Sequence, residues 1–317
     1  MPLSFVVPAT VPLQEAALAL LFSTLPAGQR RQQLADTLAA VGRREMSLDN
    51  LLVALDGDRI VGTVLAVLRP GGAAFLWPPV VQPEAATADV ASALLEAVAS
   101  RIEAQGAQFL QCLLDPADAA GREALNRGGI PYATDLILLS RSLVETGPNS
   151  PGGSFSGAGR LQPVDREGLC AECYSPESHA AFSRLVERTY VGTLDCPVLA
   201  GVRGGEESLE AHRATGQFVP NAWRLYREAG EDVGVLLLAE HPERDAWEVA
   251  YLGVIPEARG RGFGRAILYD GLALARRSGR STIEIAVDAA NAPALRLYRR
   301  LGFSDIRRFA VHLRVKQ

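Results

Sequence analysis

The sequence lacks the features that mark disulfide-rich, nucleic-acid-binding, membrane and secreted proteins. Its four cysteines in 317 residues are too few for a disulfide framework. It has no basic excess, with a formal net charge of -4 and a pI of about 5.7, so the general footprint of a nucleic-acid-binding protein is absent. No apolar run reaches about 18 residues, and the N-terminus lacks the basic and apolar segments of a signal peptide. We therefore expect a cytoplasmic protein that binds neither nucleic acid nor a membrane.

Metal-ligating patterns are also scarce. Cys170 and Cys173 form a CxxC pair, and Cys196 follows later. No second CxxC and no paired histidines follow, so we interpret the two thiols as one face of a helix and expect no metal. The histidines show no pairing and are expected to be structural or solvated; they are His179, His212, His241 and His312.

The length and one unusual segment divide the chain in two. A chain of 317 residues is about two ordinary domains long, and 48% of its residues are hydrophobic, which is enough for one core in each half. Residues 146–159 read TGPNSPGGSFSGAG, the segment richest in Gly, Pro and Ser. We predict domains at 1–145 and 160–317 joined by this linker.

The two halves repeat each other. The segment VQPEA begins at Val81, and the similar segment VIPEA begins at Val254. Gly129 and Gly302 are separated by the same offset, as are Asp115 and Asp288. Separate motifs that share one offset predict a tandem duplication. Gly62 matches Gly234 at an offset that is shorter by a single position, which requires a gap of one residue.

Each half has the same coarse pattern of elements. An opening helix precedes a pair of strands joined by a glycine-containing turn, at Asp56-Gly57-Asp58 and Ala229-Gly230-Glu231. A strand, a helix, a strand, a short helix and a final strand follow. This pattern predicts a mixed α/β sheet with helices on its faces. The expected helices and strands are 13–25, 50–55, 59–68, 109–114 and 136–142 in the first half, and 178–190, 223–228, 232–240, 282–287 and 309–315 in the second.

The strongest chemical signal is a loop rich in arginine and glycine. A strand expected at 248–254 leads through Pro256 into this loop, and an amphipathic helix is expected at 264–278. Free backbone N–H groups and the helix dipole favour an anion at a helix N-terminus. Glycines allow close approach, and arginines add fork-shaped donors, so the loop suits a pyrophosphate. A flexible basic loop and a Rossmann dinucleotide loop are the alternatives. The Rossmann pattern, however, belongs near a first strand.

Two motifs in the second half resemble a known family. Residues 259–264 match the pattern [Q/R]-x-x-G-x-[G/A], and residues 291–303 match N-x-x-A-x-x-x-Y-x-x-x-G-F. In this order, with a strand between them, they resemble the GCN5-related N-acetyltransferase (GNAT) superfamily. The detailed resemblance covers about residues 222–317. It implies an α/β fold of two tandem GNAT-like domains, each with a mixed, mostly antiparallel sheet flanked by helices.

The resemblance implies acetyl-CoA, or another acyl-CoA, as co-substrate, and no metal. The pantetheine arm would pair with the backbone of Leu252, Gly253 and Val254, and the thioester would lie where two parallel strands splay apart. Asn291 is expected to cap the helix that carries Tyr298. The residues expected to bind the cofactor are Leu252, Gly253, Val254, Arg259, Gly260, Arg261, Gly262, Phe263, Gly264, Arg265, Asn291 and Tyr298.

The implied reaction is direct attack of an amine on the thioester. Such a reaction benefits from a base for the amine and an acid for the leaving thiolate. Tyr298 is the family-typical acid, and Glu248, on the strand before the loop, is the candidate base. Glu284, Asp288 and a chain of water molecules are alternatives for the base.

The first half has lost these chemical residues. At the repeat offset, Glu248 corresponds to Phe75 and Tyr298 to Leu125. The residues that correspond to the Arg/Gly loop are Ala86, Thr87, Ala88, Asp89 and Ala91. An aspartate would repel a pyrophosphate. We therefore expect a degenerate N-terminal GNAT-like domain.

Several functional alternatives remain open. The acceptor is expected to be an amine of a small molecule or of a protein, and the protein a monomer or a homodimer. A non-catalytic acyl-CoA sensor is the main alternative to an N-acyltransferase, and a scaffold with two inactive sites is a third. Residues 190–197, which include Asp195, are expected to line the acceptor cleft.

Overall fold

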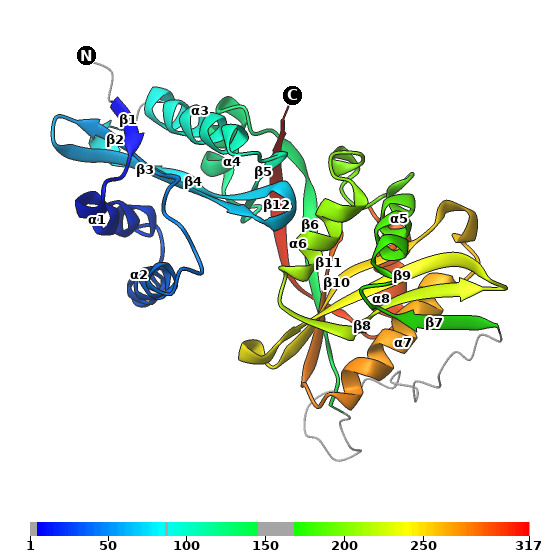
Figure 1. Cartoon of the computed structure of the whole chain (residues 1–317). Coiled ribbons are helices and arrows are strands. Elements are labelled where there is room, and N and C mark those ends of the chain that lie inside the picture. The colour runs from blue at the N-terminus through cyan, green and yellow to red at the C-terminus, as the bar shows by residue number, and fades with distance from the viewer. Residues whose placement is uncertain (1–4, 86–87, 145–167, 317) are drawn as a thin grey trace. The chain divides into compact units, whose positions relative to one another are not determined.

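The computed structural model describes residues 5–85, 88–144 and 168–316, so the predicted linker at 146–159 lies outside the described residues (Figure 1). The chain forms two compact units. Unit 1 contains Met1–Ala133 together with Phe309–Gln317, and unit 2 contains Thr134–Arg308. Each unit therefore includes a segment that the predicted ranges assign to the other half of the chain.

Unit 1 is an antiparallel sheet with one parallel pair, β4 and β5, and its strand order is β1-β2-β3-β4-β5-β12. Its strands are β1 (Phe5–Pro8), β2 (Leu51–Asp56), β3 (Arg59–Arg69), β4 (Ala73–Val81), β5 (Phe109–Leu114) and β12 (Ser304–Val315). Its helices are α1 (Val11–Leu21), α2 (Ala27–Gly42), α3 (Ala88–Ala104) and α4 (Ala119–Arg127).

Unit 2 repeats this plan, with strand order β6-β11-β10-β9-β8-β7 and one parallel pair, β10 and β11. Its strands are β6 (Tyr132–Ser142), β7 (Leu169–Cys173), β8 (Gln217–Glu228), β9 (Glu231–His241), β10 (Ala246–Val254) and β11 (Thr282–Asp288). Its helices are α5 (His179–Tyr190), α6 (Gly205–Arg213), α7 (Phe263–Arg277) and α8 (Ala292–Arg300). The predicted mixed, mostly antiparallel sheets flanked by helices are confirmed.

The strand registers reproduce the repeat. Phe75 pairs with Gln111 in unit 1, and their counterparts at the repeat offset, Glu248 and Glu284, pair in unit 2. Gly62 pairs with Val81, and Gly234 pairs with Val254. The offset between the two glycines is one position shorter than the offset between the two valines. The predicted one-residue gap therefore lies between Gly62 on β3 and Val81 on β4.

The closing strands of the two halves are exchanged. Ser142 of β6 pairs with Thr282 of β11, and Val315 of β12 pairs with Phe109 of β5. These two registers are equivalent under the repeat, so either closing strand presents the same pairing to either sheet. The units thus differ from the predicted ranges 1–145 and 160–317 in one strand each, because duplicated strands offer alternative partners.

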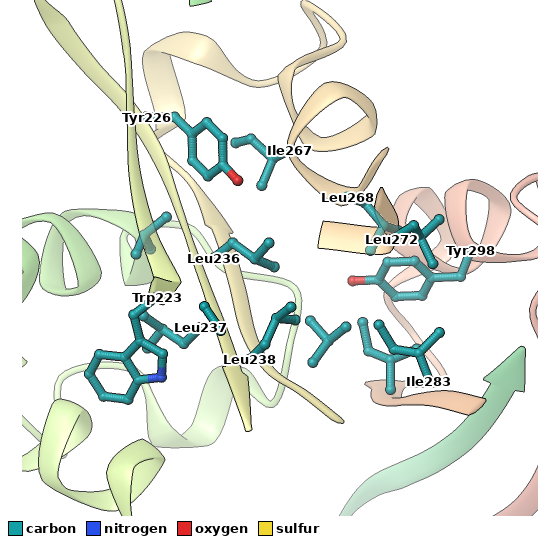
Figure 2. Packing of buried hydrophobic residues seen from close by; sticks show 14 of the residues in the cluster. Trp223, Tyr226, Leu236, Leu237, Leu238, Ile267, Leu268, Leu272, Ile283 and Tyr298 are labelled. Carbon is teal, nitrogen blue, oxygen red and sulfur yellow. The ribbon is translucent and has the colours of Figure 1, made fainter. Parts of the chain in front are cut away.

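Helices cover both faces of the unit 2 sheet (Figure 1). Trp247 of β10 donates a hydrogen bond through Nε1 to Ser278 Oγ at the end of α7. Gly253, on the same strand, faces α5, because a Cβ there would lie 2.5 Å from Thr189 Oγ1. The core contains the fully buried Leu236 and Leu268 (Figure 2). This packing fixes β10 between an α7 and α8 layer on one face and an α5 and α6 layer on the other.

Two local predictions have different outcomes. The hairpin turns are confirmed, since Gly57 and Gly230 adopt left-handed φ values of 59° and 86°. The interpretation of Cys170 and Cys173 as one face of a helix is wrong, because both lie on strand β7. Residues three apart on a strand point to opposite faces, so the two thiols diverge.

Candidate active site

The central strands of unit 2 separate beside the Arg/Gly loop. The parallel ladder joins β10 to β11 from Ala246–Thr282 as far as Val249–Ile285. Among the described residues, the ladder between these two strands has no pair beyond this point, although β10 runs on to Val254 and β11 to Asp288. β10 keeps its pairing with β9 as far as Val254 and Gly234. The splayed parallel strands expected from the resemblance are therefore present in unit 2.

A β-bulge lies at the point of separation. The register between β10 and β9 shifts between Val249 and Tyr251, which leaves Ala250 as the extra residue. A bulge reverses the alternation of side chains along the strand. Trp247 accordingly contacts the end of α7, whereas Tyr251 Oη lies 2.7 Å from Thr189 Oγ1 of α5. The bulge places Glu248 and Tyr251 on the same face, toward α5.

The Arg/Gly loop presents open backbone at the start of α7. Gly260 and Gly262 have φ values of 75° and 87°, which favour glycine strongly. The helix begins at Phe263, and its N-cap residue, Gly262, makes no side-chain capping hydrogen bond. A Cβ on Gly264 would meet only ordinary contacts, at 3.7 Å from Leu297 and 3.8 Å from Val254. The first N–H groups of α7 are therefore positioned to bind an anion.

The three arginines of this loop differ in their contacts. Arg259 donates from Nε to Val254 O at 3.1 Å, from Nη1 to Gly192 O at 2.9 Å and from Nη2 to Thr189 O at 2.8 Å. It therefore ties the end of α5 to the end of β10, a structural role that sequence reasoning missed. Arg261 Nη2 lies 2.9 Å from Glu228 Oε2, and the Arg265 guanidinium lies 5.9 Å from the centre of the Tyr269 ring. Both of these arginines are exposed.

The strand residues expected to bind pantetheine lie beyond the end of the ladder. Leu252, Gly253 and Val254 pair with β9 on one side only. Their other side faces the separation from β11. This arrangement leaves backbone groups of β10 for an extended ligand, the mode of pairing that β-strand addition uses.

Tyr298 is buried on the face covered by α7 and α8. Its side chain is 6% exposed, and Figure 2 shows its ring beside Leu272 and Ile283 with the hydroxyl pointing away from α8. Within the described part of the chain, Tyr298 Oη has no hydrogen-bond partner. Burial, with a further contribution from the charge of Asp195, raises the pKa of Tyr298 above its usual value. Asn291 accepts a hydrogen bond from Ala294 N at 3.3 Å, which confirms the predicted helix cap.

Glu248 is held by basic neighbours. Its Oε2 lies 3.3 Å from Arg244 Nη2 and 2.9 Å from His241 Nε2. The contact with His241 has the distance of an ion pair but not the alignment of a hydrogen bond. Glu284, directly opposite on β11, accepts from Arg244 Nη1 at 2.6 Å. Arg244 thus bridges the two carboxylates across the paired part of the strands.

Asp288 ends β11 and organises the loop after α5. It is 1% exposed, and its carboxylate accepts from Thr134 Oγ1 at 2.8 Å, Cys196 N at 3.0 Å and Ala290 N at 2.7 Å. Its backbone N–H donates to Asp195 Oδ1 at 2.8 Å. With this many donors, Asp288 acts as a structural anchor. The repeat gave a signal for this, since Asp115 accepts from Ala117 N at 2.9 Å in the same way.

Cys196 lies in the same loop in a strained backbone conformation, with φ at 45°. Burial, together with the charges of Asp288 and Asp195, raises the pKa of its thiol to about 11. The thiol is therefore protonated near neutral pH, which disfavours it as a nucleophile.

The equivalent positions of unit 1 carry no such groups. Phe75 replaces Glu248 on β4, and the fully buried Leu125 replaces Tyr298 on α4. Asp118 keeps the capping role of Asn291 by accepting from Gly121 N at 2.9 Å. The counterparts of Arg259 and Gly260, residues 86 and 87, lie outside the described residues. The framework of the site persists in unit 1, but its chemical side chains do not.

The described residues offer neither a metal site nor a membrane-spanning helix. No group of three or more His, Cys, Asp or Glu in this part of the chain could hold a metal ion. None of the described helices has the length and apolar character needed to cross a membrane.

Comparison with known sequences links residues 197–303 to the acetyltransferase (GNAT) family model. Among the curated relatives, a mycothiol acetyltransferase of Thermobispora bispora is 39% identical over 103 residues, 31% of this chain and 35% of the relative. A mycothiol acetyltransferase of Saccharomonospora viridis is 30% identical over 167 residues, 44% of this chain and 54% of the relative. The matched part of the chain thus spans between about a third and half of the length of these relatives.

Solved structures match over nearly the whole chain. A GCN5-related N-acetyltransferase from Sphaerobacter thermophilus has a TM-score of 0.60 at 20% identity, and the match covers 98% of this chain and 95% of that one. A tandem GNAT protein from the clavulanic acid biosynthesis pathway has a TM-score of 0.51 at 16% identity, and the match covers 98% of both chains. At these identities the likeness concerns the fold.

Proposed function

We propose that this chain is an acyl-CoA-dependent N-acyltransferase, because residues 197–303 match the acetyltransferase (GNAT) family model and the chain shares the fold of solved GNAT proteins. It transfers an acyl group, in the simplest case acetyl, to a primary amine. The observation that carries this proposal is the end of the β10–β11 ladder at Val249, beside a helix start with two left-handed glycines. One extended thioester ligand can use both features at once.

The residues of unit 2 fit the parts of acyl-CoA. The N–H groups at the start of α7, with Arg261 and Arg265 nearby, suit the pyrophosphate. The side of β10 from Leu252 to Val254 that has no strand partner among the described residues suits the amide-containing pantetheine arm, with Val254 O already accepting from Arg259 Nε. When bound, the co-substrate supplies the acyl thioester. Arg259 contributes indirectly in this account, because its donors hold the wall of the site.

The side chains favour direct transfer. Cys196 is a poor candidate for an acyl-enzyme, because the pKa of its thiol is raised to about 11. Tyr298 stays protonated, since burial raises its pKa, and its hydroxyl is available to donate a proton to a leaving thiolate. Glu248 lies one residue before the end of the ladder, and Asp195 accepts from the last residue of β11. Each has an oxygen that accepts no hydrogen bond from the described residues.

The names of the relatives guide the choice of acceptor. Curated relatives are named mycothiol acetyltransferase, and one solved structure of similar fold is named a glucosamine N-acetyltransferase region. We therefore propose desacetyl-mycothiol and glucosamine as the first amines to test. A non-catalytic acyl-CoA sensor remains the alternative function, and in that case Tyr298 would have no role in turnover.

The test is release of CoA thiol from acetyl-CoA with each amine, for the wild type and for Tyr298→Phe. We expect amine-dependent release by the wild type and a fall in kcat of about 100-fold or more in the variant. The packing should survive, because Tyr298 Oη has no hydrogen-bond partner among the described residues. Acetyl-CoA binding without amine-dependent release by the wild type would favour the sensor.

A further inference from the structure

Asp195 occupies a distinctive place at the separation of β10 and β11. Its Oδ1 accepts the backbone N–H of Asp288, the last residue of β11, at 2.8 Å. Its Oδ2 has no hydrogen-bond partner among the described residues, and the residue itself is exposed. One oxygen therefore fixes the carboxylate, and the other remains accessible.

The negative charge of Asp195 affects titratable side chains on both faces of the sheet. Asp195 contributes to the raised pKa values of Tyr190 of α5 and Tyr251 of β10 on one face, and of Tyr298 of α8 on the other. The hydrogen bond from Asp288 N places this carboxylate at the end of β11, where the two strands have parted. Tyr298, buried and without a hydrogen-bond partner in the described part of the chain, is a second group at this place that has an unused polar atom.

We propose that Asp195 binds the ammonium group of the acceptor and accepts its proton, a role that rests on the proposed acyltransferase function. The acceptor reaches Asp195 from the face covered by α5 and α6, to which Tyr190 and Tyr251 also belong. Tyr298, on the opposite layer, supplies the proton for sulfur in this proposal.

The proton balance is complete with these two side chains. Asp195 takes one proton from the ammonium, and the neutral nitrogen attacks the thioester carbonyl carbon. The carbon–nitrogen bond forms and the carbon–sulfur bond breaks. Tyr298 protonates the sulfur and recovers a proton from the attacking nitrogen, and the proton on Asp195 passes to solvent. The products are the amide, CoA thiol and one released proton.

The other carboxylates near the site are less suited to this role. Both Asp288 oxygens already accept hydrogen bonds, and its side chain is 1% exposed. Glu248 shares its Oε2 between Arg244 and His241, and Arg244 also holds Glu284. A cation that reached Glu248 would have to compete with a guanidinium already in place.

The ionised form of Asp195 is disfavoured by its surroundings, although the residue is exposed. Desolvation by the surrounding protein is the main cause of its raised pKa; the nearby charge of Asp288 adds to it, and the hydrogen bond from Asp288 N opposes it. A raised pKa means that the ionised form is disfavoured in the folded state, so the stability that Asp195 contributes at low pH is lost as pH rises through its folded pKa. If the residue at this position had only a structural role, a neutral side chain would stabilise the folded state more than an ionised one.

The test compares Asp195→Asn with Glu248→Gln in the full-length chain, with Asp305→Asn, a carboxylate paired only with Arg299, as the control for charge. The probes are glucosamine and desacetyl-mycothiol. The readouts are kcat/KM from pH 5 to 9, acetyl-CoA affinity by calorimetry and the thermal midpoint at pH 7. The charged and titratable groups around Asp195 that can shape this profile are Tyr190, Cys196, Tyr251, Asp288 and Tyr298.

We expect Asp195→Asn to lower kcat/KM by about 100-fold or more and to remove the acidic limb of its pH profile. Its acetyl-CoA affinity should stay within about twofold, and its thermal midpoint should be unchanged or higher. A larger loss in Glu248→Gln, or an unchanged profile in Asp195→Asn with an active wild type, overturns the proposal. A lower midpoint with proportionate loss of acetyl-CoA affinity also overturns it, because it makes Asp195 structural. A wild type that binds acetyl-CoA but acetylates neither amine overturns acyl transfer itself.

Discussion

At the scale of single residues, the site combines groups fixed by geometry with groups left available for chemistry. Asp288 and Arg259 have their donors or acceptors occupied by backbone partners and hold the site together. Within the described residues, Tyr298 Oη and one oxygen of Asp195 have no hydrogen-bond partner. This difference is the basis on which we propose supporting roles for Asp288 and Arg259 and reacting roles for Tyr298 and Asp195.

His212 gives a pH-dependent prediction at this scale. Its ring stacks on Tyr251 at 5.1 Å, and burial, helped by the charge of Arg203, lowers its pKa to about 3. An unfolded histidine titrates near 6.5, so between about pH 6.5 and 3 the unfolded state binds a proton that the folded state does not. Stability therefore falls as the solution is acidified.

We expect His212→Phe, which keeps an aromatic ring against Tyr251, to reduce this acid sensitivity. The free energy of unfolding should fall less between pH 7 and pH 5 than in the wild type, by at most about 2 kcal/mol. Urea unfolding at the two pH values measures it. Equal pH dependence in both proteins would show that His212 is not buried in its neutral form.

At the scale of elements, a loop, a bulge and a helix start build the site around β10. The bulge at Ala250 places Tyr251 on the α5 face, and the loop after α5 carries Asp195 to the end of β11. Arg259 connects these parts by binding carbonyls of α5, of the loop and of β10. In the proposed site, one guanidinium therefore links the acceptor side to the co-substrate side.

Arg259→Lys tests this link. A lysine keeps the charge but cannot reach three carbonyls from a planar fork. We expect a loss of about 1–2 kcal/mol in the free energy of unfolding and a several-fold rise in KM for the amine, with a smaller change in acetyl-CoA affinity. Calorimetry and steady-state kinetics would measure these quantities. Unchanged stability with a large loss of acetyl-CoA affinity would instead make Arg259 a direct ligand of the pyrophosphate.

The sequence predicted most of these elements but not how they combine. Strand 109–114 and the cap at Asn291 are as predicted, because alternation and capping are local signals. The bulge at Ala250 depends on the register with β9, so no local pattern marks it. β7 was not expected as a strand, since five residues with a CxxC spacing carry little periodicity. The hydrogen bond from Thr134 to Asp288 joins residues from opposite halves of the chain, and no sequence pattern predicts it.

At the scale of the whole molecule, duplication makes each half depend on the other. β6 comes from the first half of the chain and pairs with β11 in unit 2, while β12 comes from the second half and pairs with β5 in unit 1. The two compact units therefore do not coincide with the ranges 1–145 and 160–317 predicted from the sequence. The first half, although it lacks the chemical residues, supplies the closing strand and Thr134 to the unit that carries the site.

This exchange predicts that residues 160–317 alone are less stable than the full-length chain. Without β6, strand β11 is either an unpaired edge, which favours aggregation, or pairs with β12, whose register is equivalent. In both cases the hydrogen bond from Thr134 to Asp288 is lost. Co-expression with residues 1–145 should restore a soluble complex that binds acetyl-CoA. Thermal unfolding and sedimentation of the fragment, alone and with its complement, provide the measurement. A fragment that unfolds cooperatively at the wild-type midpoint would contradict the exchanged arrangement.

The central claim is that unit 2 alone carries an acyl-CoA site at the start of α7, and Gly264 tests it most directly. Gly262 is a poor position for a substitution, because its φ of 87° would strain any side chain, whereas Gly264 lies within the helix with room for a Cβ. The measurement is the shift in thermal midpoint on adding acetyl-CoA to the wild type, Gly264→Asp and the size-matched Gly264→Asn. Ligand at about 100 times its Kd should stabilise the wild type by roughly 2.7 kcal/mol, a shift of several degrees. The account predicts that Gly264→Asp abolishes this shift and that Gly264→Asn weakens it less. No wild-type shift, or an equal shift in Gly264→Asp, would contradict it.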